Sequence, residues 1–556
     1  MEAIHKHTKK TFLSGVLLLS ISTLLVKIIG LIYKMPMLTY LGSEGMGYFN
    51  SAYEIYALFC VIATAGLPVA LSVLIAEALA HGNYGRVRRV YRASMTVFLW
   101  IGVLGTLLML VFAGQFCRLI KSENAYLCIL SIAPTVFFVC VSSALRGYFQ
   151  GHQRMLPTAI SQLLESLGKL IFGLLFARFA LQRGYATPTV AAFAGVGLTL
   201  GSAVSTLYLV IEKYRFRTEE GSLSSPKSTE NAEKYREIWK RLAALAVPMT
   251  LGASLVSLTK LIDMTMILRR LQAIGYTETL ANEAYGSYTT LALSVYGLLP
   301  ALVNAVAMPL LPMLTAAIAS GERERQAHLI RSSYRLTAIF AIPSALGIAA
   351  FAHPILSLLF GHEPGAVAVA APLLSNLGLS VFLSCMITAT NSVLHAYRAV
   401  NRPILSMLAG AIVKIVSAYF LIGLPSLGLA GAPISTLLCN ATVVLFNLWF
   451  SARLCHVERL GEVFWRPLLS SVLSVGAALG VYLQLSRAVS SMPRALIPSL
   501  LTACAVYLVT SCLLGVVRDE DVRLLPFGEG LCRILKRVRL LPRKNDEKLS
   551  ERNQIS

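Results

Sequence analysis

Residues 12–75 read FLSGVLLLSISTLLVKIIGLIYKMPMLTYLGSEGMGYFNSAYEIYALFCVIATAGLPVALSVLI. Two apolar runs, roughly 12–33 and 48–75, flank a short glycine-rich connection. Each run is long enough to cross the hydrocarbon layer of a bilayer, which takes roughly 20 residues of helix. This stretch therefore predicts two membrane-spanning helices.

The first of these runs carries a polar stripe. Ser20, Thr23, Lys27, Gly30 and Lys34 follow one another at steps of three or four residues, a spacing that places them on one face of a helix. Because a polar face is costly against lipid, it should face other helices or a water-filled cavity. The alternative is that Lys27 extends outward to the membrane surface, as we expect for Lys34.

The composition supports a membrane protein. Apolar residues make up 56% of the chain and charged residues only 14%, and the mean hydropathy is +0.68. These values are typical of a polytopic membrane protein. The ten cysteines include no CxxC and the nine histidines no HExxH, so we expect no metal, no cofactor and no hydrolase site.

The succession of apolar runs predicts an all-α, polytopic membrane protein with about 14 transmembrane helices. The expected spans are roughly 12–33, 48–75, 93–114, 125–150, 157–181, 188–211, 241–268, 285–315, 331–352, 366–396, 403–423, 429–452, 467–486 and 495–517.

Basic residues predict the orientation of these spans. With a cytoplasmic N-terminus, 36 of the 49 lysines and arginines fall in inside segments, nine in outside segments and four within spans. Such a bias is the expected signature of a multi-pass protein of the cell membrane with both termini in the cytoplasm. It also accounts for most of the net charge of +22. The expected partner of these basic residues is therefore the lipid bilayer and not nucleic acid.

The spans show an internal repeat. Lys27 precedes Pro68 by 41 residues and Lys260 precedes Pro300 by 40, and a second proline–lysine spacing recurs in the fifth and eleventh spans. This pattern predicts two pseudo-symmetric six-helix lobes followed by two C-terminal helices. The expected domains are an N-lobe (1–211), a cytoplasmic linker (212–240), a C-lobe (241–453), spans 13 and 14 (454–517) and a basic cytoplasmic tail (518–556).

Charged residues inside the expected spans are the candidate site. Two lysines lie three or four residues from a carboxylate, and two have no acidic neighbour in their own span. The resulting excess of positive charge suits an anionic group such as a diphosphate, because ammonium groups bind phosphate well. The lining lysines would be Lys27, Lys169, Lys260 and Lys414; Glu165 and Asp263 would tune them or couple an ion; Lys34 and Arg146 are candidates for a gate. The same close pairs are also compatible with ion pairs that only hold helices together.

Several motifs resemble one known family. They are KIIGLIYKMPMLTYLGSEGMGYFNSAYEIY (27–56), AGLPVALSVLIAE (65–77), RGYFQGHQRMLPTAISQLLE (146–165), LIDMTMILRRLQAIG (261–275) and LGLAGAPIST (427–436). In their order and spacing, over nearly the whole chain, they resemble the stage V sporulation protein B-like branch of the multidrug/oligosaccharidyl-lipid/polysaccharide exporter superfamily. That branch is similar to the lipid II flippases of peptidoglycan synthesis.

The resemblance implies a two-lobed fold of fourteen helices around a central cationic cavity. It implies a non-enzymatic flippase that moves a lipid-linked diphosphate oligosaccharide, such as lipid II or a related precursor, to the outer leaflet. Lys27 matches the basic residue of the first-span motif in that family, and wall-synthesis proteins would be further partners. Two alternatives are a cation-coupled multidrug antiporter of the same fold and a membrane scaffold for wall synthesis that transports nothing.

Overall fold

The computed structural model describes residues 2–221, 234–307, 310–399, 401–455, 460–488 and 492–516. All regular elements in these ranges are helices, so the predicted all-α class is confirmed. The predicted linker (212–240) lies partly outside the described residues, and the predicted basic tail (518–556) lies wholly outside them.

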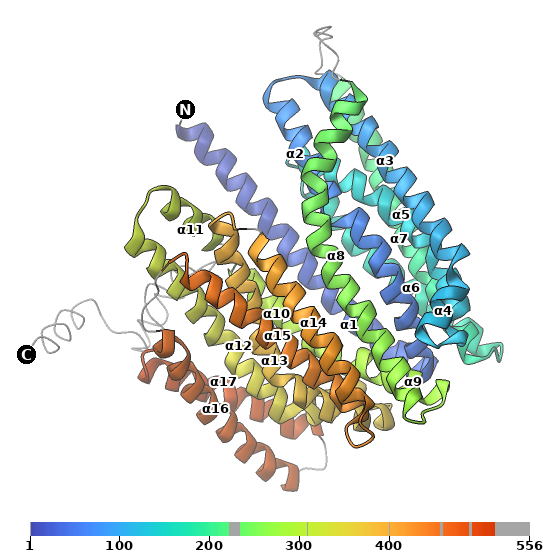
Figure 1. The fold of residues 1–556 in the computed structure, drawn as a ribbon, viewed down its shortest axis with the longest axis vertical. Helices are drawn as coiled ribbons and strands as arrows, with labels where there is room; N and C mark the ends of the chain where they lie inside the picture. Colours follow the sequence, from blue (N-terminus) through green and yellow to red (C-terminus); the bar gives the residue numbers. More distant parts are fainter. Residues whose placement is uncertain are drawn as a thin grey trace, which may run out of the picture. The chain divides into compact units, whose positions relative to one another are not determined.

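The helices group into two compact units. The first comprises the residues up to Thr290 together with Ile422–Leu429. Its helices are α1 (Glu2–Thr64), α2 (Leu67–Ala80), α3 (Tyr84–Val111), α4 (Ala113–Ile120), α5 (Tyr126–Gly151), α6 (Leu156–Gln182), α7 (Thr187–Gly221), α8 (Tyr235–Ala273) and α9 (Glu278–Ser287) (Figure 1).

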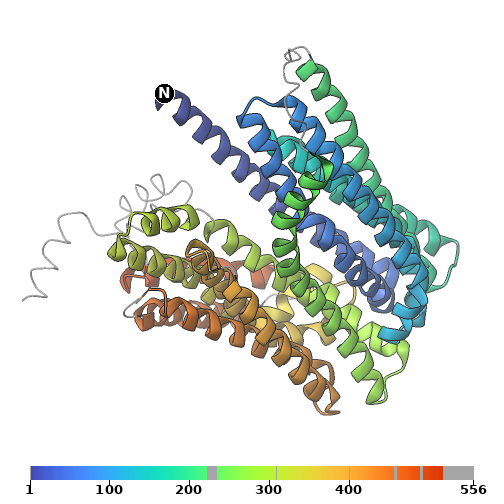
Figure 2. The same cartoon turned by 45° about the horizontal axis from the view of Figure 1, so that its top comes forward.

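The second unit comprises Leu291–Leu421 and the described residues from Ala430 onward. A short π-helix (Tyr288–Ala292) lies at the boundary between the units. The helices of the second unit are α10 (Leu293–Ala307), α11 (Leu310–Ala319), α12 (Arg323–Phe360), α13 (Pro364–Ala396), α14 (Asn401–Gly423), α15 (Gly431–Ala452), α16 (Leu460–Ala488) and α17 (Met492–Leu513) (Figures 1 and 2).

Twelve helical segments among the described residues are long and apolar enough to cross a membrane. The first runs from Ile21 to Ala80 over 60 residues. It covers the later part of the expected span 12–33 and all of the expected span 48–75. The expected span at 285–315 includes residues 308–309, which lie outside the described residues. Large apolar side chains such as Trp100, Val111 and Leu445 are exposed, as expected of surfaces that face lipid.

Two breaks shape the first two helices. Gly42 interrupts α1 with φ 65° and ψ 176°, a conformation that glycine adopts without steric cost. The expected run at 48–75 is also divided, because α1 ends at Thr64 and α2 begins at Leu67. Pro68 lies in the first turn of α2, where its missing N–H costs nothing and its fixed φ suits a helix start.

A shared apolar core holds α2, α3, α5, α7 and α8 of the first unit together. Leu71, Phe98, Phe149 and Leu242 are among the buried side chains of this core. In the second unit, α16 packs on α12 and α17 through Phe351, Ala478 and Leu496. Both cores lie within single units, so each unit has its own hydrophobic support.

Candidate functional site

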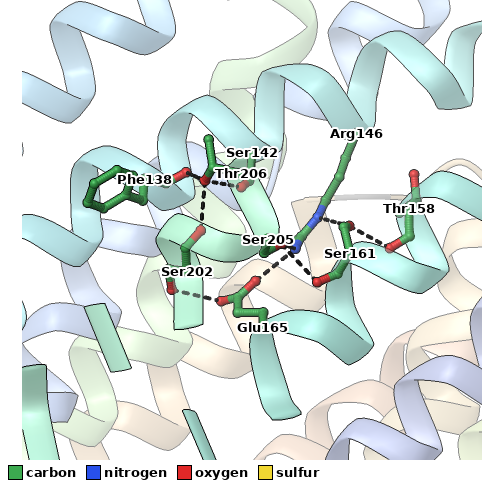
Figure 3. Close-up of polar contacts among 9 residues, drawn as sticks. All are labelled: Phe138, Ser142, Arg146, Thr158, Ser161, Glu165, Ser202, Ser205 and Thr206. Carbon is green, nitrogen blue, oxygen red and sulfur yellow. Dashed lines mark hydrogen bonds and ion pairs between the residues drawn. The ribbon is translucent and has the colours of Figure 1, made fainter. Parts of the chain in front are cut away.

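Arg146 lies at the centre of a polar network between α5, α6 and α7 (Figure 3). Its Nη2 lies 2.7 Å from Glu165 Oε2, and the two side chains are only 13% and 23% exposed. Arg146 also donates to Ser161 Oγ at 2.9 Å and to Ser205 Oγ at 3.3 Å. Ser202 donates to the other Glu165 oxygen at 3.5 Å. The shielded charge pair is thus satisfied by hydroxyl groups as well as by its partner.

Hydroxyl groups extend this network along α5 and α7. Thr206 Oγ1 lies 2.8 Å from Ser142 Oγ and donates to the backbone oxygens of Phe138 at 3.0 Å and Ser202 at 2.8 Å (Figure 3). These bonds satisfy small polar groups between packed helices without any charge.

Glycines allow α6 and α7 to approach closely enough for these contacts. A Cβ on Gly168 would lie 2.6 Å from Gly201 Cα, and a Cβ on Gly201 would lie 2.6 Å from the backbone nitrogen of Lys169. No side chain fits at either position without moving a backbone. The close approach brings the α7 serines to the turn of α6 that carries Glu165 and Lys169.

The ammonium group of Lys169 lies among aromatic rings from α1. Its Nζ is 4.7 Å from the ring centroid of Tyr53, 5.0 Å from that of Tyr33 and 5.6 Å from that of Phe49. Each contact is within cation–π range. Glu165, the neighbour predicted from the spacing, instead forms its short bond with Arg146, although it remains close enough to Lys169 for electrostatic interaction.

Two lysines of α1 and one of α8 complete this region. Lys260 interacts electrostatically with both Lys27 and Lys34, and Lys34 also interacts with Lys169. Lys34, which we expected to reach the membrane surface, instead donates to the backbone oxygen of Thr289 at 3.3 Å. In the first unit, electrostatic interactions thus link Lys27 to Lys260, Lys260 to Lys34 and Lys34 to Lys169. These four residues are called the lysine cluster below.

Carboxylates accompany the lysine cluster. Glu54 on α1 interacts electrostatically with Lys34. Asp263 lies one turn after Lys260 on α8, and both Glu54 and Asp263 act on Tyr285 of α9. Acidic groups are thus available to tune the lysines, as the sequence suggested for Asp263.

The fourth predicted lining lysine belongs to the second unit. Lys414 lies on α14 and interacts electrostatically with Tyr296 of α10. The hydroxyl of Tyr296 accepts a hydrogen bond at 3.1 Å from Asn440, which also donates to the backbone oxygen of Ser380 at 3.4 Å. The structure therefore groups three of the four predicted lysines in the first unit, and the fourth, Lys414, belongs to the second unit.

Sequence reasoning missed several residues of the first unit. The rings of Tyr33, Phe49 and Tyr53 and the carboxylate of Glu54 were not predicted. Asn50 was also missed, although it donates to Thr289 Oγ1 at 2.8 Å. A usable signal was present in the quoted motif, since residues 49, 50, 53 and 54 recur at helical spacing within one short stretch.

Solved structures of other proteins show the same fold. One, described as "Lipid II flippase MurJ, inward closed conformation", matches with a TM-score of 0.67 at 15% identity over 89% of this chain and 98% of that chain. Another, an inward-facing multidrug resistance MATE family transporter of the MOP superfamily, matches with a TM-score of 0.58 at 16% identity over 78% of this chain and 98% of that chain. The fold is that of the multidrug/oligosaccharidyl-lipid/polysaccharide superfamily of membrane transporters.

The family follows from the sequence comparisons. The profile described as "Polysaccharide biosynthesis protein" matches residues 12–318, more than half of the chain, and the MatE profile matches residues 248–420. The chain belongs to the polysaccharide biosynthesis protein family, as the resemblance predicted.

Two relatives from Bacillus subtilis (strain 168) are similar along most of their length. Stage V sporulation protein B is 25% identical over 443 residues, which cover 79% of this chain and 83% of that protein. Lipid II flippase MurJ is 24% identical over 418 residues, which cover 73% of this chain and 76% of that protein. The family and the fold are those of multi-pass membrane transporters and not of enzymes, in line with the prediction. Among the described residues, no group of three or more His, Cys, Asp or Glu could hold a metal ion.

Proposed function

We propose that the protein is a flippase that moves a lipid-linked oligosaccharide or peptidoglycan precursor from the inner to the outer leaflet by alternating access. The observation that carries this proposal is the lysine cluster of the first unit. Four ammonium groups at membrane depth attract an anion, and a diphosphate offers several oxygens to ammonium donors. The similarity to a protein described as a lipid II flippase supports the same class of cargo.

The other predicted residues fit around this cargo. Glu165 and Asp263 tune the lysines or couple a cation, and Lys414 is the remaining predicted cargo-binding lysine. Lys34 and Arg146 are the proposed gates, since Lys34 can exchange Thr289 for a phosphate oxygen and Arg146 ties α5 to α6 and α7.

The proposed arrangement in the membrane has fourteen spans. The twelve segments found support this count when Ile21–Ala80 is taken as two crossings and the expected span at 285–315 is added. In this arrangement both termini are cytoplasmic, spans 1–6 and 7–12 form the two lobes, and the tail at 518–556 lies against the inner leaflet of the cell membrane. The cargo would serve cell-wall or spore-cortex synthesis.

A cation-coupled multidrug antiporter is the second candidate. The MatE profile over residues 248–420 and the similarity to multidrug transporters favour it. A site for cationic drugs needs an excess of carboxylates, whereas the first unit gathers four lysines. A wall-synthesis scaffold without transport is the third candidate, and it requires none of these lysines.

Complementation tests the proposal. The protein is expressed in cells whose own lipid II flippase can be switched off, and survival and outer-leaflet lipid II are measured. We expect rescue by the wild type and by Lys240→Ala, an exposed lysine at the start of α8, and at least a tenfold loss of flipping for Lys27→Ala and Lys414→Ala at equal membrane levels. Rescue by both of the latter variants would remove these lysines from the mechanism.

No rescue by a well-expressed wild type would reject lipid II as the cargo. A drug-resistance assay in the same cells then separates the antiporter from the scaffold. Resistance that is lost in Asp263→Asn and kept in Lys27→Ala would support the antiporter.

A further inference from the structure

A pocket with a volume of about 370 Å³ lies in the first unit, between α3, α5 and α7. Three cationic and three tyrosine side chains line it, and no acidic side chain does. These six residues are Arg88, Arg92, Lys213, Tyr91, Tyr148 and Tyr214. A concave site that combines cations and phenol groups without carboxylates is suited to an anionic ligand.

The remaining lining is apolar and lies deeper along the same helices. Met95, Val141, Leu145 and Val210 are the apolar residues of the pocket. Arg88 and Met95 are seven residues apart on α3, which is about 10 Å along the axis of a helix. Helix α5 runs opposite to α3, because Gly102 lies near Cys140 and Gly105 near Val136, and α7 runs parallel to α5. On α5 and α7 the apolar lining residues accordingly precede the polar ones in the sequence by one or two turns. The pocket therefore changes from charged to apolar along its length.

The polar end of the pocket is held in place by ring contacts. Lys213 Nζ lies 3.3 Å from the ring centroid of Tyr91 and 5.4 Å from that of Tyr148. The two rings lie 5.0 Å apart, nearly edge to face, and Tyr148 belongs to the buried core of the unit. A cation held against aromatic faces keeps its charge, and rigid support lowers the entropy lost when a ligand binds.

The polar end also has the composition of a membrane interface. Arg88 and Arg92 are exposed. They lie between the expected spans 48–75 and 93–114, a connection that the predicted orientation places on the cytoplasmic side. Trp239 at the start of α8 donates to the backbone oxygen of Ala93, next to Arg92, at 3.0 Å. Tryptophan, tyrosine and basic residues gather where a protein crosses the headgroup layer.

We propose that this pocket binds the phosphate-bearing headgroup of an anionic phospholipid of the inner leaflet. The phosphate contacts Arg88, Arg92 and Lys213, and the glycerol and upper acyl chain lie along the apolar end. A soluble anion gains nothing from that apolar end, whereas a phospholipid uses both ends. None of the pocket's residues belongs to the lysine cluster, so this site goes beyond the proposed function.

The test measures lipid binding by the purified full-length protein in neutral detergent. The probe is phosphatidylglycerol with a fluorescent acyl chain, and the competitors are unlabelled phosphatidylglycerol, phosphatidylcholine and inorganic phosphate. The pocket variant is Arg88→Gln with Arg92→Gln. The matched control is Arg89→Gln with Arg215→Gln, which removes the same charge from α3 and α7 outside the pocket lining.

Of the three competitors, we expect only unlabelled phosphatidylglycerol to displace the fluorescent probe. The pocket variant should bind about 30-fold more weakly, which corresponds to about 2 kcal/mol for two basic residues near a membrane surface, and the control should stay within about threefold of the wild type. Equal weakening of both variants would show diffuse charge attraction and overturn the proposal. Competition by inorganic phosphate as strong as that by phosphatidylglycerol would overturn it in favour of a soluble anion.

A second variant tests the apolar end without changing charge. Val141→Trp narrows that end, so we expect at least a tenfold loss of phosphatidylglycerol binding. Unchanged binding would show that the lipid does not occupy the pocket. Lipid binding at this pocket does not require translocation. Loss of the lipid-binding proposal would therefore leave the flippase proposal unaffected, and failure of the complementation experiment would leave the lipid-binding proposal unaffected.

Discussion

Removal of the Arg146 guanidinium should destabilise the first unit, because the shielded carboxylate of Glu165 then loses its charged partner. At 2.7 Å, Arg146 and Glu165 attract each other by about 6 kcal/mol for an effective dielectric constant of 20, and desolvation offsets most of this gain. Loss of one partner of a buried pair costs about 3–5 kcal/mol. Because Glu165 is still 23% exposed, we expect about 3 kcal/mol for Arg146→Met.

A double-mutant cycle isolates the interaction between the two side chains. Glu165→Gln leaves Arg146 with the hydroxyl groups of Ser161 and Ser205, so this variant should lose less than Arg146→Met. The double variant should lose less than the sum of the two single variants, with a coupling of about 2 kcal/mol.

A matched control exists in the same unit. Arg241 and Glu77 form a pair at 2.8 Å, but their side chains are 44% and 41% exposed. Arg241→Met and Glu77→Gln should show a coupling of only about 0–1 kcal/mol, because water screens the pair.

The assay is unfolding of the purified protein in mixed micelles with increasing sodium dodecyl sulfate, followed by tryptophan fluorescence. Equal coupling in the two cycles would refute the argument that burial decides the strength of these pairs. If Arg146→Met unfolds at the same detergent concentration as the wild type, the structural role of the network is refuted.

Two further predictions concern helix contacts, and both are checked by the same unfolding assay. Gly201→Ala should cost about 1–3 kcal/mol because its Cβ would lie 2.6 Å from the backbone of Lys169, whereas Gly252→Ala, with nothing within 4 Å, should be neutral or gain up to about 1 kcal/mol. Equal effects of the two alanines would contradict the close packing of α6 on α7. Asn50→Ala should cost about 1–3 kcal/mol, since Asn50 is buried and donates to the hydroxyl groups of Thr289 and Thr290; a stability equal to that of the wild type would contradict the contact between α1 and the π-helix.

The helices were largely predictable because each crossing needs a long apolar run. The positions at which the helices break were less predictable. The glycine-rich connection did predict an interruption near Gly42, where the backbone turns to φ 65°. The second break, between Thr64 and Leu67, falls inside an unbroken apolar run. Gly66 and Pro68 carried the local signal for it, and glycine and proline can also be accommodated within a membrane helix.

The candidate site was predictable in its residue types and not in its pairings. Charges inside apolar runs identify Lys27, Glu165 and Lys260 from sequence alone, because lipid excludes unpaired charge. Pairings across helices depend on packing distances that spacing along one helix does not contain. Glu165 has Lys169 one turn away on its own helix, yet its short bond is to Arg146 from α5.

The contacts of Arg146 and Lys169 assign these two cations different roles. Arg146 makes three hydrogen bonds, one of them to a carboxylate, and all three must break before it can bind anything else. Lys169 lies over three rings, which hold a cation with about 0.5–2 kcal/mol and leave its charge intact. A phosphate oxygen offers an ammonium group a charge-assisted hydrogen bond that rings cannot match. We therefore expect Lys169 to exchange its rings for the cargo, while Arg146 keeps Glu165 in place and moves only when α5, α6 and α7 rearrange.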